Sequence, residues 1–158
     1  MSKELAIGHF LTLFPKTASN GTLRFQNFYI NQNVSDNGED FSFLPFGFSG
    51  ISINRAGDNV DASLVFPNTG LTRPWSVVSI RNAWVARVQT MLLNPSDQTA
   101  TKQQLYDYTG QISEGGWDNT TVSVTLNSVL NAVSANVPHR VLDQSLVGFI
   151  PTTTRVNV

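Results

Sequence analysis

The fold of this chain is decided by the stretch Trp84-Val85-Ala86-Arg87-Val88-Gln89-Thr90-Met91-Leu92-Leu93-Asn94-Pro95-Ser96-Asp97. It is a long apolar run closed by a Pro/Asp turn, which predicts a central β-strand covered on both faces. Two strands are expected after it, over Tyr108-Thr109-Gly110-Gln111-Ile112 and Thr121-Val122-Ser123-Val124-Thr125-Leu126. The second alternates strictly, so its three apolar residues share one face. An extended tail from Pro138-His139-Arg140 follows.

The rest of the chain is divided by turn signals into short runs rich in β-branched and aromatic residues. We expect strands at Leu23–Ile30, at Val60–Phe66 and in the Phe-rich run Phe41–Ile53, where Pro45 removes a ladder donor and predicts an edge, bend or bulge. This spacing of strands and turns is typical of a β-sandwich or a split barrel. The turn signals are Asn20-Gly21, Asp36-Asn37-Gly38, Ala56-Gly57-Asp58, Pro67-Asn68, Asn94-Pro95 and Gly115-Gly116.

One short helix fits between Leu71 and Ile80. Thr72 is placed to cap it, and Leu71, Trp75 and Val78 recur at helical spacing, which predicts that they form its apolar face.

The chain as a whole is predicted to be a single mainly β domain of residues 1–158, with one short α-helix and an extended C-terminal arm, Val137–Val158. Ser128–Ala135 is a second helical candidate. The N-terminal stretch Glu4–Phe14 fits a helix or a strand equally well, and both alternatives stay open.

The composition favours a protein that is buried among neighbours. Charged residues are 13% of the chain, against about 25% in a typical soluble domain. A surface poor in charge costs less desolvation when it docks. The alternative is a monomer with a polar, uncharged surface, which would have the same composition. The net charge is -1 and no cluster of Lys or Arg is present, which argues against sequence-specific or other nucleic-acid binding.

Several kinds of site and a membrane span are excluded by features that the sequence lacks. There is no cysteine, so disulfides, thiolate metal sites and Cys catalysis are excluded. The start Met1-Ser2-Lys3-Glu4 has no apolar signal core, and no stretch approaches 18 apolar residues. We therefore expect no secretion signal, no membrane span and synthesis in a cytoplasm.

No catalytic or metal-binding motif stands out. His9 and His139 are isolated, which favours packing or surface roles over a zinc site. The acidic loop Asp36-Asn37-Gly38-Glu39-Asp40 lacks the EF-hand pattern and is read as a hairpin turn. Gly47-Phe48-Ser49-Gly50 has the wrong spacing for a nucleophile elbow and is read as a β-bend. Almost all carboxylates fall in predicted turns, so a glycosidase pair remains only a minor alternative. We expect no enzyme activity and no cofactor.

Trp117 differs from the other aromatic residues. It follows Gly115-Gly116 in a predicted turn, so we expect it to be exposed. An anchor in an oligomer interface and a sugar-stacking residue both fit this position.

From about Phe41 to its end, the chain resembles a family of small phage tail proteins that lie at the tail tip or baseplate of long-tailed phages. The shared pattern is a Phe-x-Phe strand, a strand with an Asn-rich turn, a short helix, a long apolar strand, a Gly-x-Ile strand, an alternating strand and a Pro-Arg tail. The residues that carry it are Phe41, Phe43, Phe46 and Phe48; Ala62–Asn68; Val85–Asp97; Gly110 and Ile112; Val122–Leu130; Val137-Pro138-His139-Arg140; and Phe149-Ile150-Pro151.

The chain is also similar to the N-terminal barrel of lambda-like minor tail proteins. Those proteins continue into a Cys-rich, cluster-binding region, whereas this chain has no cysteine, so no iron–sulfur role is expected. The resemblance implies a protomer related to tail tube proteins that forms a hexameric or trimeric ring at the virion tail tip. Such a ring would join the tail tube to the hub and the receptor-binding fibres, with the tape-measure protein as a further partner.

Two segments are the best interface candidates under this resemblance, together with Trp117. One is the loop Asp36-Asn37-Gly38, and the other is the C-terminal arm, which either packs on an adjacent subunit or folds back on its own barrel. The arm residues proposed for the interface are Arg140, Leu142, Leu146, Val147, Phe149 and Ile150.

Other functions remain open beside the tail-tip ring. A tube, tail-terminator or head–tail connector subunit would be a different structural phage protein. A carbohydrate-binding module would use Trp117 to stack on a sugar.

Overall fold

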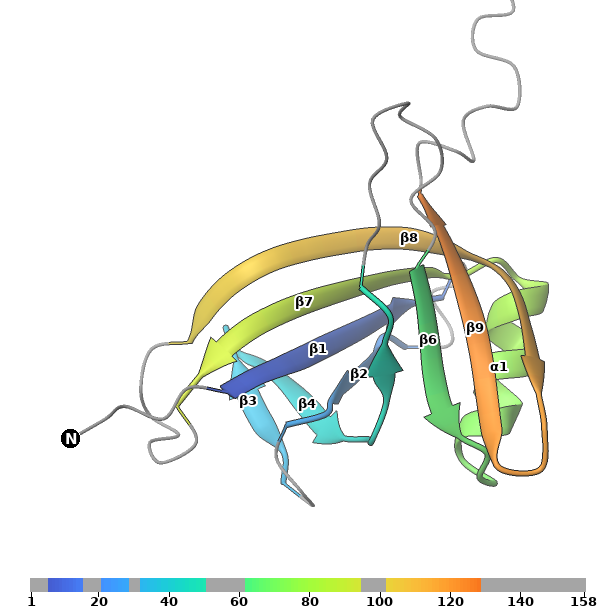
Figure 1. Ribbon diagram of the computed structural model, residues 1–158, viewed down its shortest axis with the longest axis horizontal. Coiled ribbons are helices and arrows are strands. Elements are labelled where there is room, and N and C mark those ends of the chain that lie inside the picture. The colour runs from blue at the N-terminus through green and yellow to red at the C-terminus, as the bar shows by residue number, and fades with distance from the viewer. Residues whose placement is uncertain (1–5, 16–20, 29–31, 51–61, 95–101, 129–158) are drawn as a thin grey trace, which may run out of the picture.

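The computed structural model describes residues 6–15, 21–28, 32–50, 62–94 and 102–128. These residues form a mainly β structure with one α-helix, as predicted (Figure 1). The elements are β1 (Ala6–Phe14), β2 (Leu23–Gln26), β3 (Val34–Asp36), β4 (Glu39–Phe43), β5 (Gly47–Phe48), β6 (Ala62–Pro67), α1 (Thr72–Arg81), β7 (Val85–Leu93), β8 (Gln103–Trp117) and β9 (Thr121–Ser128).

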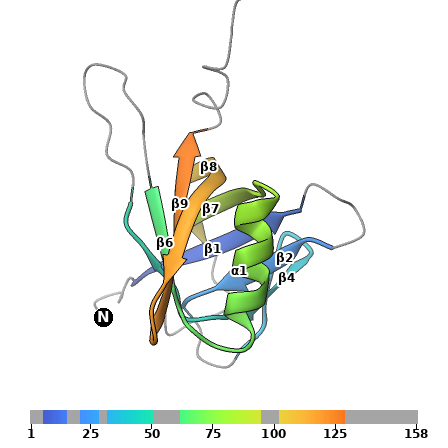
Figure 2. The same cartoon turned by 90° about the vertical axis from the view of Figure 1, so that its right-hand side faces the viewer.

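All nine strands belong to one mixed sheet in the order β3-β4-β2-β1-β7-β8-β9-β6-β5. Every pairing is antiparallel except that between β2 and β4. The sheet bends strongly, so that β6 and β9 cross the direction of β1 and β7, and α1 stands beside the far end of β8 and β9 (Figures 1 and 2).

The two ends of the sheet are joined by a very short segment of chain. β4 pairs near one end and β5 forms the other edge, yet only Leu44, Pro45 and Phe46 separate them. Asn27 ties this corner to the barrel wall, because its Nδ2 donates to the Phe46 carbonyl at 3.0 Å. The sheet is therefore a split barrel whose ends are linked covalently, and the bend predicted at Pro45 is confirmed.

β7 lies between β1 and β8 and has two buried faces, as its apolar sequence predicted. The described residues form two hydrophobic cores, one on each face of β7. Ala86 and Val88 belong to the larger core, and Met91 and Leu93 form the smaller core with Phe10 and Phe41. Each face is covered along a different part of the strand.

The larger core fills the inside of the bent sheet. β9 contributes the alternating residues Val122, Val124 and Leu126, which are all at most 1% exposed, as the strict period predicted. The other buried members are Leu11, Leu13, Leu44, Phe46, Ala62, Leu64, Phe66, Trp84, Ala86, Val88, Tyr108 and Ile112.

The helix occurs where it was predicted, but two details of the prediction were wrong. Thr72 is the first helical residue rather than the cap, and the cap position is Leu71. The start of the helix is held by a reciprocal pair: Thr72 N donates to Thr69 Oγ1 at 3.1 Å, and Thr69 N donates to Thr72 Oγ1 at 3.0 Å. Two hydroxyls thus satisfy backbone donors that a helix start leaves unpaired.

The predicted apolar face of the helix was also wrong. Leu71 and Val78 are 65% and 37% exposed, and of the three predicted residues only Trp75 packs against the larger core. The fully buried residues are the small polar ones, Thr72, Ser76 and Ser79. Small side chains let the helix axis approach the sheet closely, and this contact determines which face turns inward.

The remaining predictions are settled in part. Glu4–Phe14 is a strand over its described residues. The predicted strand Leu23–Ile30 is a strand from Leu23 to Gln26, Asn27 and Phe28 are not, and Tyr29 and Ile30 lie outside the described residues. The helical candidate Ser128–Ala135 lies outside the described residues, except for Ser128, which ends β9. The arm Val137–Val158 also lies outside them.

Candidate assembly surfaces

Trp117 is half exposed, as predicted, but it ends a strand rather than lying in a turn. Gly115 and Gly116 are also in β8, paired with Val124 and Ser123, so the turn predicted there was wrong. The register of β8 against β9 shifts by one residue between Ile112 and Glu114. This bulge turns Trp117 to the face that carries the core residues of β9, because side chains alternate along a strand.

The same bulge brings Gly115 under the helix. A Cβ atom on Gly115 would lie 2.6 Å from the Ser123 carbonyl oxygen and 2.8 Å from Ile80 Cδ1. Only glycine fits this contact without movement of the strand or the helix. Gly115 therefore sets the distance between α1 and the end of β8.

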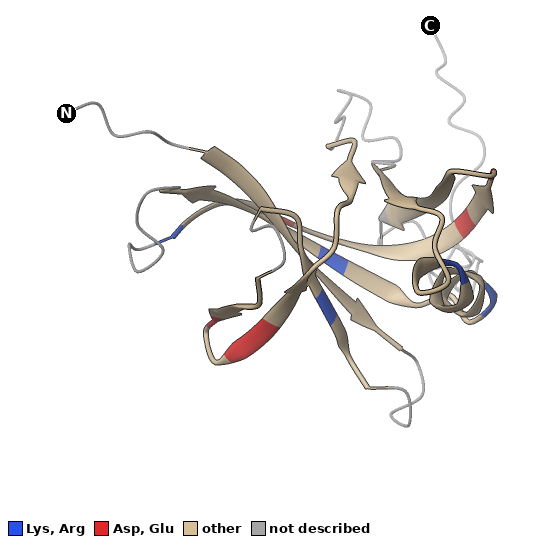
Figure 3. Ribbon diagram, turned by 90° about the horizontal axis from the view of Figure 1, so that it is seen from below, with Lys and Arg blue, Asp and Glu red and all other residues tan. Residues whose placement is uncertain are grey.

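Arg73 lies over the exposed indole of Trp117, with its guanidinium carbon 5.3 Å from the ring centroid. This is cation–π geometry, and it links α1 to the end of β8. Arg73 and Arg81 are eight residues apart, so they lie on one side of the helix, and both are exposed. We name the exposed set Arg73, Val78, Arg81 and Trp117 the arginine face (Figure 3 shows the arginines in blue).

The β8–β9 turn that follows Trp117 is fixed by Asp118. Its carboxylate accepts hydrogen bonds from the Thr120 and Thr121 amides at 2.7 and 2.6 Å, and from both threonine hydroxyls. These bonds favour the charged form and lower the pKa of Asp118 to about 2. Asn68 N also donates to the Thr120 carbonyl at 2.7 Å, which attaches the turn to the segment leading into α1.

The loop Asp36-Asn37-Gly38 is a hairpin turn between β3 and β4, as predicted. Asn37 and Gly38 have φ angles of 51° and 81°, the left-handed pair that a two-residue type I′ turn requires. We name residues Asp36–Asp40 the acidic hairpin. Figures 1 and 3 place it and the arginine face at opposite ends of the molecule.

Two of the three acids in this hairpin have cationic partners. Lys102 Nζ lies 3.2 Å from Asp36 Oδ1 and also donates to the Ser35 carbonyl, which covers the edge of β3. Arg24 forms an ion pair with Glu39. Asp40 is exposed and has no ion pair within the described residues.

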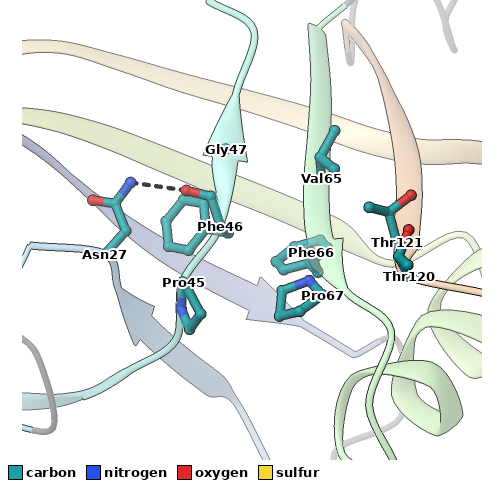
Figure 4. Close-up of a pocket in the computed structure, with 9 residues that line it drawn as sticks. All are labelled: Asn27, Pro45, Phe46, Gly47, Val65, Phe66, Pro67, Thr120 and Thr121. Carbon is teal, nitrogen blue, oxygen red and sulfur yellow. Dashed lines mark hydrogen bonds between the residues drawn. The ribbon is translucent and has the colours of Figure 1, made fainter.

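A shallow apolar hollow of about 430 Å³ opens where the barrel is split. The rings of Pro45 and Phe46 line one side, and Phe66 and Pro67 line the other (Figure 4). Asn27 lies beside Phe46 and donates a hydrogen bond to its carbonyl (Figure 4). Among the residues that the structure describes, no charged side chain lines the hollow.

His9 packs inside the barrel wall, consistent with the packing role expected for it. Its ring is 5.6 Å from the Phe48 ring, edge to face, and its Nδ1 is 3.0 Å from Thr90 Oγ1. Burial disfavours the imidazolium and lowers the pKa of His9 below its usual value. His139 lies outside the described residues.

Within the described ranges, no group of three or more His, Asp or Glu side chains is placed to hold a metal ion. In the same part of the chain, no helix is long and apolar enough to cross a membrane.

The predicted interface residues thus fall into two groups. Asp36, Asn37, Gly38 and Trp117 are described. Trp117 ends β8, and that end of β8 lies far from the β3–β4 hairpin in Figure 1, so the structure does not bring the hairpin and the tryptophan together. The arm residues Arg140, Leu142, Leu146, Val147, Phe149 and Ile150 lie outside the described residues. Sequence reasoning missed Arg73, whose stacking on Trp117 depends on the bulge.

Comparison with known proteins gives a structural likeness but no sequence match. The sequence matches no protein family and no curated protein. Among solved structures, the fold is similar to a chain in the virion of a native gene transfer agent particle, with a TM-score of 0.54 and 15% identity. The likeness covers 87% of this chain but only 44% of the other, so this chain spans less than half the length of the protein it matches. At this identity the likeness establishes a shared fold.

Proposed function

We propose that this protein is a structural component of a phage-like virion. The observation that carries the proposal is the split-barrel likeness, over 87% of the chain, to a chain in a gene transfer agent virion. The low charge content supports it, because a surface with few charges is desolvated at little cost when subunits assemble.

The more specific role that we propose is an oligomeric ring at the tail tip or baseplate. A hexameric or trimeric ring would join the tail tube to the hub and the receptor-binding fibres. Closed rings need two different surfaces on each subunit, because each copy meets its two neighbours head to tail. We propose the arginine face and the acidic hairpin as these two surfaces, and in Figure 3 α1 and the β3–β4 hairpin lie at opposite ends of the barrel.

We propose that the protein has no catalytic activity of its own. The sequence carries no recognisable catalytic motif, and within the described residues the chemistry-bearing groups serve local structure. His9 packs among aromatic rings, and the Asp118 carboxylate is occupied by the turn that it caps.

Two measurements test the proposal. Antibodies raised against the purified protein are expected to label intact particles at one tail end in electron micrographs. Absence of the protein from purified particles would refute the virion role. Native mass spectrometry over a range of concentrations separates the structural roles: a closed ring supports the tail tip, whereas long filaments support a tube subunit.

A carbohydrate-binding module is the second candidate, supported by the half-exposed indole of Trp117. Arg73 covers part of that ring, and sugar-stacking sites commonly use an open aromatic face. Binding to cell-envelope glycans that is lost in Trp117→Ala and kept in Phe14→Ala would favour this candidate. Phe14 is a suitable control because it is also exposed, at 39%, and lies on β1.

A further inference from the structure

We propose that the acidic hairpin of one copy docks on the arginine face of the next copy. This inference rests on the proposed function, because it names the two surfaces through which neighbouring subunits of the ring would meet. The partner is a second copy of this chain, and the contact is head to tail.

The two arginines of the arginine face form no ion pair with the part of the chain that the structure describes. The described ion pairs are Arg24–Glu39, Arg87–Asp107 and Lys102–Asp36, so Arg73 and Arg81 have no acidic partner within the described residues. Apolar surface lies beside them, since Trp117 is 49% exposed and Val78 is 37% exposed. Tryptophan and arginine are among the residues enriched at the hot spots of protein interfaces.

The acidic hairpin supplies the complementary charge. Asp40 is exposed and has no cationic partner within the described residues, while Glu39, next to it, is 48% exposed at its side chain despite its pairing with Arg24. The type I′ turn and the Lys102 contact hold the hairpin in one conformation. A preorganised loop loses little conformational freedom when it docks.

The positions of the two surfaces determine the kind of assembly. A two-fold contact that paired the hairpin of each copy with the arginine face of the other would use both surfaces at once and would end at a dimer. The ring proposed above requires the head-to-tail contact instead, in which unlike charges pair and each copy keeps one surface free for its next neighbour. Such contacts continue until a ring closes.

Charge reversal provides the first test. Arg73→Glu and Asp40→Arg are each expected to lower assembly at least tenfold, measured as the concentration at half-assembly by light scattering. Thr109→Glu adds a charge in the middle of β8, at an exposed position away from the expected contact, and is expected to assemble as the unchanged chain does. Circular dichroism and thermal unfolding confirm that each variant folds.

Mixing the two charge-reversal variants gives a sharper result. In the mixture, Glu at position 73 of one copy meets Arg at position 40 of the other, and the alternate contacts keep the original pair. Assembly is therefore expected to return in an equimolar mixture, and only in rings with an even number of subunits. If the native ring is a trimer, the mixture cannot alternate around it and is expected to form open pairs of the two variants. Failure of the mixture to form either rings or such pairs, with both variants folded, would overturn the proposed contact.

Cross-linking gives an independent readout, because the chain contains no cysteine. The double variant Asp40→Cys/Arg73→Cys is expected to form a ladder of covalent oligomers with a short bis-maleimide cross-linker, which spans the gap that an Arg–Asp contact leaves between the two backbones. The pair Thr109→Cys/Arg73→Cys is the control and is expected to give no ladder. This inference is overturned if the unchanged chain stays monomeric at all concentrations and the double variant forms no ladder. The virion role is overturned only if the protein is absent from particles.

Discussion

Gly115 and Ile80 are packed so closely that a methyl group does not fit between them. A Cβ atom on the glycine would lie 2.8 Å from Ile80 Cδ1 and 2.6 Å from the Ser123 carbonyl oxygen. The helix therefore rests directly on the backbone of β8, and the position of the arginine face depends on this contact.

Gly115→Ala is expected to lower the free energy of unfolding by about 1–3 kcal/mol, because the added methyl must displace backbone. Gly116→Ala is the matched control, since nothing lies within 4 Å of a Cβ atom at that position. Urea denaturation of both variants measures the difference. Equal stabilities would show that α1 does not pack on β8 as described.

Asn27→Ala is expected to destabilise the corner where the Leu44–Phe46 link joins the two ends of the sheet. The Asn27 side chain accepts from His9 N at 2.8 Å and donates to the Phe46 carbonyl at 3.0 Å. Loss of both bonds is expected to cost about 1–3 kcal/mol of unfolding free energy. Hydrogen exchange should also speed up at the His9 amide. Gln104→Ala removes an exposed side-chain pair and is expected to change neither measurement.

Asp118 is expected to make the free energy of unfolding depend on pH in the acidic range. Its pKa is about 2 in the folded protein and 3.8 without these bonds, so its contribution is present above about pH 4 and is lost as the pH falls through 2. Asp118→Asn removes this part of the dependence. The test is the free energy of unfolding from pH 2 to 6, and an unchanged difference between the two proteins across that range would contradict the role of the carboxylate.

His9 is expected to act at milder acidity. Burial lowers the pKa of His9 in the folded protein below 6.5, so protons bind the unfolded chain more tightly. Stability is therefore complete above pH 6.5 and falls as the pH drops toward the folded-state pKa. In His9→Gln the decrease in melting temperature between pH 7.5 and 5.5 should be smaller. An NMR titration of the ring that gave a pKa at or above 6.5 would exclude this effect.

The elements with local signals were predictable from the sequence. Val122, Val124 and Leu126 alternate without exception, and Asn37-Gly38 is the strongest short hairpin signal, so β9 and the β3–β4 turn were correctly predicted. Their conformations depend on a few adjacent residues.

The elements that depend on distant contacts were not predictable. The helix carries apolar residues at 71, 75 and 78 but small ones at 72, 76 and 79, and both sets have helical spacing. Which set turns inward depends on Gly115, more than thirty residues away, through a one-residue bulge that no local pattern marks. The partnership of Arg73 with Trp117 follows from the same bulge and was missed for the same reason.

The short link Leu44–Phe46 has a mechanical consequence. In a barrel whose first and last strands are joined by hydrogen bonds, a force that pulls these strands apart can break the bonds one at a time. Here the ends of the sheet are joined by peptide bonds, so a force that pulls on β5 is transmitted along the chain to β4. It then acts as a shear force on the hydrogen bonds of the parallel pair β2 and β4. The split in the barrel can therefore widen only as far as three residues allow.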